Sequence, residues 1–107
     1  DGALIQSSDA RLKKQIIPVS NSLLKLKQLN GYNYYWIDST RGNDLQTGLL
    51  AQEVEQVMPE LVKVKEDGTK AVNYSGVIAY LVEANKELIR KVETLERELQ
   101  LLKENKH

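Results

Sequence analysis

Near the start of the chain, Ser8 and Lys13 are the residue types that could perform covalent chemistry. A serine hydroxyl attacks a carbonyl only when a neighbouring base accepts its proton. The single histidine, His107, is the last residue of the chain, so we expect no Ser-His-Asp triad within one chain, and the base must be a lysine or a carboxylate. A lysine can serve when burial or a nearby cation favours its neutral form, and Arg11 and Lys14 are close in sequence.

The separation of Ser8 and Lys13 by five residues does not place both side chains on one face of a helix. A loop or a strand-to-turn arrangement must therefore bring them together. The spacing is a weak signal by itself, because Ser8 followed by Asp9 is also typical of a helix cap or a turn. These residues alone leave a catalytic and a purely structural interpretation open.

The chain that must position this pair ends in a predicted long helix. In this helix a leucine recurs at every seventh residue, at Leu81, Leu88, Leu95 and Leu102. A strict repeat of seven predicts a left-handed coiled coil, in which the leucines occupy d positions. In a parallel arrangement, Lys91 would attract Glu96 of a neighbouring helix, and Glu98 would attract Lys103. The predicted oligomer core consists of Ile78, Leu81, Asn85, Leu88, Val92, Leu95, Leu99 and Leu102.

Three residues beside the leucines bear on the number of strands. Asn85 falls at an a position, where it exchanges stability for register and oligomer state. Val82 and Ile89 at e positions widen the apolar stripe, which favours more than two strands, or packing of the first half of the helix against the rest of the chain. The alternative is a single amphipathic helix that packs entirely on its own domain.

Length and composition exclude several classes of function. A chain of 107 residues is one small domain, and a head of about 75 residues is marginal without oligomerisation. There is no cysteine, and Lys+Arg and Asp+Glu number 15 each. We therefore expect no metal site, no cofactor and no nucleic-acid interface. No apolar run approaches about 18 residues, so we expect no membrane span and no membrane partner.

Short helices and strands precede the long helix. Turn residues and apolar spacing place their boundaries. The pattern predicts a helix capped by Ser20 and ended by Asn30-Gly31, an aromatic strand over 32–37, a polar loop over 38–44, a helix over 49–58, a hairpin of 61–65 with 70–74 turning at Asp67-Gly68, and a last helix capped by Ser75 that runs to about Asn105.

Four motifs together resemble the C-terminal intramolecular chaperone domain of phage tailspikes and tail fibres, the endosialidase-type chaperone of the S74 peptidase family. The resemblance covers residues 8 to about 100. The motifs are Ser8-Asp9-x-Arg11-Leu12-Lys13-Lys14, Leu26-x-x-Leu29-x-Gly31-x-x-Tyr34-x-Trp36, Thr47-Gly48-Leu49-Leu50-Ala51-Gln52-Glu53-Val54 and Pro59-Glu60-Leu61-Val62.

This resemblance implies an α+β fold in an intertwined homotrimer, with a small head of helices and short antiparallel strands followed by a long coiled-coil helix. It divides the chain into the end of a preceding stalk segment (1–7), a chaperone head (8–75) and the coiled-coil helix (76–107). Such domains assist folding of the upstream β-stalk of the same polypeptide and then release themselves by autoproteolysis. The implied partners are copies of the chain and that stalk.

The resemblance also implies the site. The cut falls at the Ser7–Ser8 bond, with Ser8 as nucleophile and Lys13 as general base, in a single turnover without a cofactor. Possible supporting residues are Asp9, Arg11, Gln52 and Glu53, although Asp9 is equally suited to cap a turn and Gln52 and Glu53 to solvated or capping roles.

The implied setting is a tail-fibre precursor made in the cytoplasm of a bacterial host, with the chaperone domain absent from the mature virion after cleavage. Two alternatives stay open. One is a structural trimerisation domain of a fibrous protein that never cuts. The other is an ordinary coiled-coil adaptor, which predicts a dimer and no dependence on Ser8.

Overall fold

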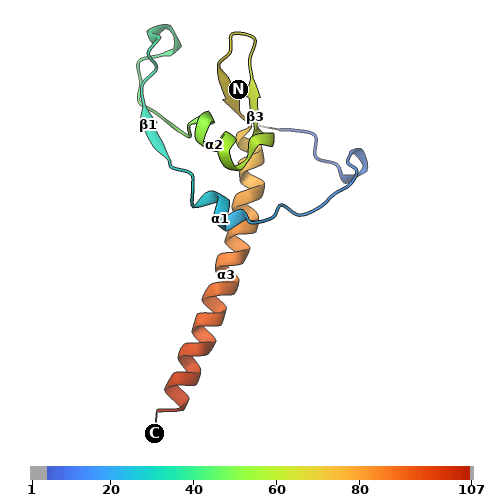
Figure 1. The fold of residues 1–107 in the computed structure, drawn as a ribbon, viewed down its shortest axis with the longest axis vertical. Helices are drawn as coiled ribbons and strands as arrows, with labels where there is room; N and C mark the ends of the chain where they lie inside the picture. The colour runs from blue at the N-terminus through green and yellow to red at the C-terminus, as the bar shows by residue number, and fades with distance from the viewer. Residues whose placement is uncertain (1–4, 107) are drawn as a thin grey trace.

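The computed structural model describes residues 5–106, so the predicted stalk segment lies partly outside the described residues, as does His107. A head of short elements surrounds the first turns of one long helix (Figure 1). The predicted α+β class is confirmed. The elements are η1 (Ala10–Leu12), α1 (Ser22–Leu26), β1 (Tyr32–Tyr34), η2 (Ser39–Arg41), β2 (Gln46–Gly48), α2 (Ala51–Val57), η3 (Pro59–Leu61), β3 (Val62–Val64), β4 (Lys70–Val72) and α3 (Tyr74–Glu104).

Two antiparallel hairpins project from the head (Figure 1). The pairing of β3 with β4 matches the predicted hairpin, and Gly68 supplies the positive φ of 88° that its turn requires. A hairpin turn was one of two predictions for the polar loop over 38–44, but no strand was predicted over 46–48, where β2 pairs with β1. The register of this pairing sets Tyr32 opposite Gly48, and the predicted strand ends early because Trp36 and Ile37 enter the connecting loop, where Ile37 is fully exposed.

The first helix is shorter than its apolar spacing indicates. Asn21 adopts a left-handed conformation with φ of 54° and makes no side-chain cap, so α1 starts at Ser22 rather than directly after Ser20. Beyond Leu26 the backbone tightens, and Leu29 N–H donates to the Leu26 carbonyl over 3.0 Å. The leucine pattern therefore continues through a turn that the sequence alone does not distinguish from a helix.

The later boundaries also shift by a few residues. Helix α2 starts at Ala51 instead of Leu49, because Leu50 keeps an extended backbone. Helix α3 is capped by Asn73, not by Ser75, which lies in its first turn. The Asn73 side-chain oxygen accepts a hydrogen bond of 3.2 Å from Gly76 N–H, and Asn is among the best N-cap residues.

The core of the head lies between α2, η3 and the first turns of α3. It is formed by Val54, Met58, Leu61, Val77 and Tyr80. Helix α1 packs on α3 beside this core. Val77, Tyr80 and Ala84 are spaced by three and four residues, so they lie on one face of α3, and all three are buried. The Lys25 ammonium of α1 lies 5.3 Å from the centre of the Tyr80 ring, a favourable cation–π distance.

The predicted oligomer core occupies a different face of α3. Each head-facing residue precedes a heptad-core residue by one position, for example Val77 before Ile78 and Ala84 before Asn85, a turn of about 100° around the axis. Within one protomer these core side chains stay exposed, as at Leu95 (63%) and Leu102 (69%). The helix therefore packs on its own head only through its first turns. Among residues 5–106, no helix has the length and apolarity to cross a membrane.

Candidate functional site

The 3₁₀ turn η1 brings Ser8 and Lys13 together. One turn of chain separates the two residues, and it folds Lys13 back so that its Nζ donates a hydrogen bond of 2.9 Å to Ser8 Oγ. The turn closes through Lys13 N–H, which donates to the Ala10 carbonyl over 3.1 Å. Two side chains that a helix would point apart thus meet across a turn, as the spacing requires.

Asp9 and Arg11 build the turn between the two residues. The Asp9 carboxylate accepts a hydrogen bond of 2.9 Å from Arg11 N–H and caps η1. The Arg11 guanidinium returns to the same carboxylate, with Nη2 2.8 Å from Oδ2. These contacts hold the pKa of Asp9 below its usual value and raise the pKa of Arg11. Of the roles that the sequence allows for Asp9, the contacts show the turn cap.

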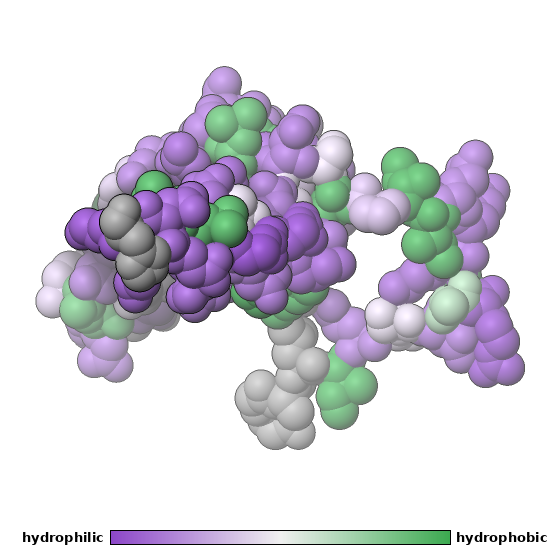
Figure 2. Space-filling view, turned by 90° about the horizontal axis from the view of Figure 1, so that it is seen from below, coloured by the Kyte–Doolittle hydropathy of each residue, from purple (hydrophilic) through white to green (hydrophobic). Residues whose placement is uncertain are grey.

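The pair stands on an extended segment, residues 5–21, which we call the N-terminal arm. The arm loops out to one side of α3 in Figure 1 and returns to it at α1, and Figure 2 shows hydrophobic residues on the arm that stand apart from the main body. Leu12, Ile16 and Ile17 are 75%, 67% and 80% exposed. In a single protomer the pair is therefore open to water, where a serine hydroxyl is a weak nucleophile.

Gln52 and Glu53 lie on α2, and no contact of the described residues joins them to Ser8 or Lys13. Gln52 is exposed. Glu53 Oε2 accepts a hydrogen bond of 2.7 Å from the Tyr32 hydroxyl, a contact that raises the pKa of Tyr32. Glu53 Oε1 is buried and has no hydrogen-bond partner among the described residues. The sequence indicated Glu53 but missed Tyr32, because the link depends on where β1 lies relative to α2.

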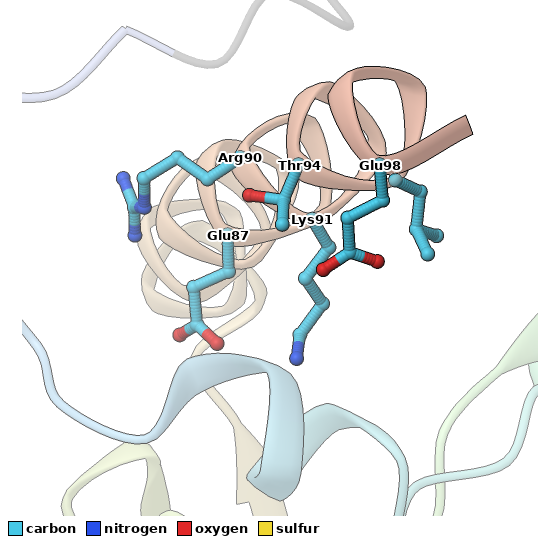
Figure 3. Close-up of a pocket in the computed structure, with 6 residues that line it drawn as sticks. Glu87, Arg90, Lys91, Thr94 and Glu98 are labelled. Carbon is cyan, nitrogen blue, oxygen red and sulfur yellow. The ribbon is translucent and has the colours of Figure 1, made fainter. Parts of the chain in front are cut away.

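A shallow depression of about 650 Å³ lies farther along α3 (Figure 3). All of its lining residues come from that one helix: Glu87, Arg90, Lys91, Thr94, Leu95 and Glu98. A ligand site needs convergent groups from more than one side, so this surface is better suited to a second helix. In the part of the chain that the structure describes, no cluster of three or more His, Cys, Asp or Glu residues could hold a metal ion.

Comparison with known proteins places the sequence of this chain in a family. Residues 8–63 match the family model described as chaperone of endosialidase. The chain is 37% identical to the long tail fiber protein Gp37 of Salmonella phage S16, over 92% of its own length and 14% of that protein. It is 40% identical to the Gp37 proteins of Enterobacteria phages K3 and T2, over 86% of its length and 8% and 7% of theirs.

The matched segment begins at Ser8, the first residue of the Ser8–Lys13 pair, and runs through α2 to β3. It thus includes both the turn η1 and the Tyr32–Glu53 contact. The chain spans about a tenth of the length of the curated relatives it matches. The chain therefore belongs to the chaperone-of-endosialidase family and is similar to part of the long tail fiber proteins of these phages.

Proposed function

We propose that this domain trimerises, assists folding of the β-stalk upstream of it, and then cuts its own chain between Ser7 and Ser8. The observation that carries the proposal is the hydrogen bond of 2.9 Å between Lys13 Nζ and Ser8 Oγ. It joins a nucleophile and a base across the one turn that the matched family segment begins with.

The chemistry is an acyl transfer within one chain. Neutral Lys13 accepts the hydroxyl proton of Ser8 while Ser8 Oγ attacks the carbonyl carbon of Ser7. The Ser7–Ser8 C–N bond then breaks, the Ser8 nitrogen takes up the proton that Lys13 carries, and an ester links Ser7 to Ser8 Oγ. Water hydrolyses this ester, which leaves a carboxylate on Ser7 and restores the Ser8 hydroxyl.

The state of the single protomer explains why the cut would wait for assembly. Lys13 Nζ lies 2.9 Å from Ser8 Oγ, and both residues are exposed in the single protomer. Removal of water favours the neutral form of a lysine in general, and only the neutral form can act as a base. Because the arm is exposed in one protomer, a neighbouring protomer or the stalk must supply that shielding.

The exposed face of α3 supports a parallel trimer. The seven apolar residues at the a and d positions of α3 are each at least 44% exposed in the protomer. The eighth core residue, Asn85, donates a hydrogen bond of 2.7 Å from Nδ2 to the Leu81 carbonyl of its own helix. The depression along α3 adds Lys91 and Glu98, whose charges suit Glu96 and Lys103 of a neighbour. The long tail fibre relatives favour a fibrous stalk as the segment that is chaperoned.

We place the domain in a tail-fibre precursor synthesised in the cytoplasm of a bacterial host, with the released chaperone missing from the mature virion. The second candidate is a trimerisation domain that does not cut. The exposed apolar core of α3 supports that role without any contribution from Ser8.

Intact mass spectrometry of the domain fused to its native upstream segment tests the proposal. The wild type should yield a product that begins at Ser8, and Ser8→Ala and Lys13→Ala should stay uncut. Lys14→Ala is the matched control, since Lys14 is a neighbouring exposed lysine and should cut normally. A trimeric wild type that stays uncut would favour the second candidate, and an uncut dimer would favour the adaptor.

A further inference from the structure

We call the a and d positions of the predicted coiled-coil core of α3 the seam. The e and g positions that flank this seam are charged in the C-terminal half of the helix and apolar in the N-terminal half. In a parallel coiled coil, a g residue of one helix faces the e residue five positions later on its neighbour. The two C-terminal g–e pairs are charged. The two N-terminal ones are apolar, because their g residues are Val77 and Ala84 and their e residues are Val82 and Ile89. The flank is therefore built for ionic contact far from the head and for apolar contact beside it.

The two sides of each apolar pair differ in burial. Val77 and Ala84 are 8% and 3% exposed, because the head of the same protomer covers them. Val82 and Ile89 are 51% and 57% exposed. Since g faces e across the seam, the head that covers Val77 and Ala84 in one protomer lies beside Val82 and Ile89 of the next.

The head presents apolar side chains at this border. Helix α1 packs on α3, yet Leu24 of α1 is 60% exposed. The N-terminal arm leads directly into α1 and carries Ile16 and Ile17, which are exposed to a similar degree. Contact between these three side chains and the two e residues of the neighbour would remove all five exposed apolar groups from water.

We infer that the segment from Ile16 to Leu24 of one protomer docks on Val82 and Ile89 of the adjacent protomer, which fixes the N-terminal arm in trans. The inference rests on the proposed function and deepens it. Lys13 precedes the docked segment by three residues and Ser8 by eight, so docking restrains the pair near the partner protomer. Assembly and cleavage are then coupled through this contact, in addition to the a and d core.

Engineered disulfides test the contact, because the chain contains no cysteine. Two differently tagged chains are co-expressed, one carrying Ile89→Cys and the other Ile17→Cys or, in a parallel experiment, Leu24→Cys. Ile37→Cys is the control, because Ile37 is fully exposed but lies in the β1–β2 loop. Oxidation should join the tagged chains through Ile89→Cys and at least one of the two segment cysteines, and not through Ile37→Cys.

A second measurement reads out the coupling. The double variant Val82→Ser/Ile89→Ser should remain oligomeric and lose cleavage, whereas Leu101→Ser should keep it, because Leu101 is as exposed as Ile89 but lies outside the seam. A trimer that cuts normally but forms neither disulfide overturns the inference and leaves the proposed function standing. A wild type that forms no trimer or makes no cut overturns the proposed function itself.

Discussion

The Tyr32 hydroxyl donates a hydrogen bond of 2.7 Å to Glu53 Oε2 and so ties β1 to α2. The second carboxylate oxygen of Glu53 is buried and has no partner within residues 5–106. Tyr32 therefore makes the hydrogen bond that offsets the desolvation of this carboxylate within the protomer. The contact connects the projecting β1–β2 hairpin to helix α2, which contributes to the core of the head.

Replacement of Tyr32 by Phe leaves the Glu53 carboxylate half-buried without this hydrogen bond. We expect Tyr32→Phe to lower the free energy of unfolding by about 1–3 kcal/mol, measured by urea denaturation. Tyr35→Phe is the control, because Tyr35 is 65% exposed and lies just beyond β1. Equal loss in the two variants would show that the Tyr32–Glu53 contact does not stabilise the head.

Gly76 marks the closest approach of α3 to η3. A Cβ on Gly76 would clash with Leu61 Cδ2 and lie 3.3 Å from Leu61 Cδ1 and Cγ, and Leu61 belongs to the core. We expect Gly76→Ala to destabilise the head by about 1–3 kcal/mol, although alanine favours helices. A Cβ on Gly31 meets nothing within 4 Å, so the thermal midpoint of Gly31→Ala should stay close to that of the wild type. A stable Gly76→Ala would contradict the tight packing.

Leu88 lies at the predicted coiled-coil core and Leu101 outside it, and they are 44% and 57% exposed in the protomer. Leu88→Asp would bring like charges together in an apolar core, so we expect it to dissociate the proposed trimer. Leu101→Asp should remain a trimer in analytical ultracentrifugation. Dissociation by both substitutions, or by neither, would count against the assigned register.

Tyr80 should make the head sensitive to alkaline conditions. Burial of its ring, followed by its hydrogen bond to the Glu60 carboxylate, raises the pKa of Tyr80 to about 12. The folded state holds this proton more tightly than the unfolded chain, in which the pKa of tyrosine is about 10. The resulting stability is fully present below about pH 10 and is lost as the pH rises through about 12.

Urea denaturation at a series of alkaline pH values checks this sign. The wild type should lose stability above about pH 10 more steeply than Tyr80→Phe, which cannot ionise at this position. The other four tyrosines are present in both proteins, so the difference between the two curves reports Tyr80. Parallel curves would show that the environment of Tyr80 does not oppose its ionisation.

Much of the architecture was predictable from local patterns. The Asp67–Gly68 turn fixed the β3–β4 hairpin, and the apolar spacing indicated α2 and α3 to within a few residues. The β1–β2 pairing was not predictable, because strands of three residues carry too little alternation to reveal a partner. The left-handed Asn21 likewise shortened α1 without a signal in the leucine pattern.

The sequence by itself determined the residue types of the Ser8–Lys13 pair, the repeat of seven in α3 and the family resemblance, because each depends on spacing along the chain. The tertiary structure decided which face of α3 the head covers and which face stays exposed. It also decided that Tyr32, rather than Lys13, contacts Glu53 in the protomer. Those outcomes depend on how separate elements pack together, and packing between distant segments has no periodic trace in one sequence.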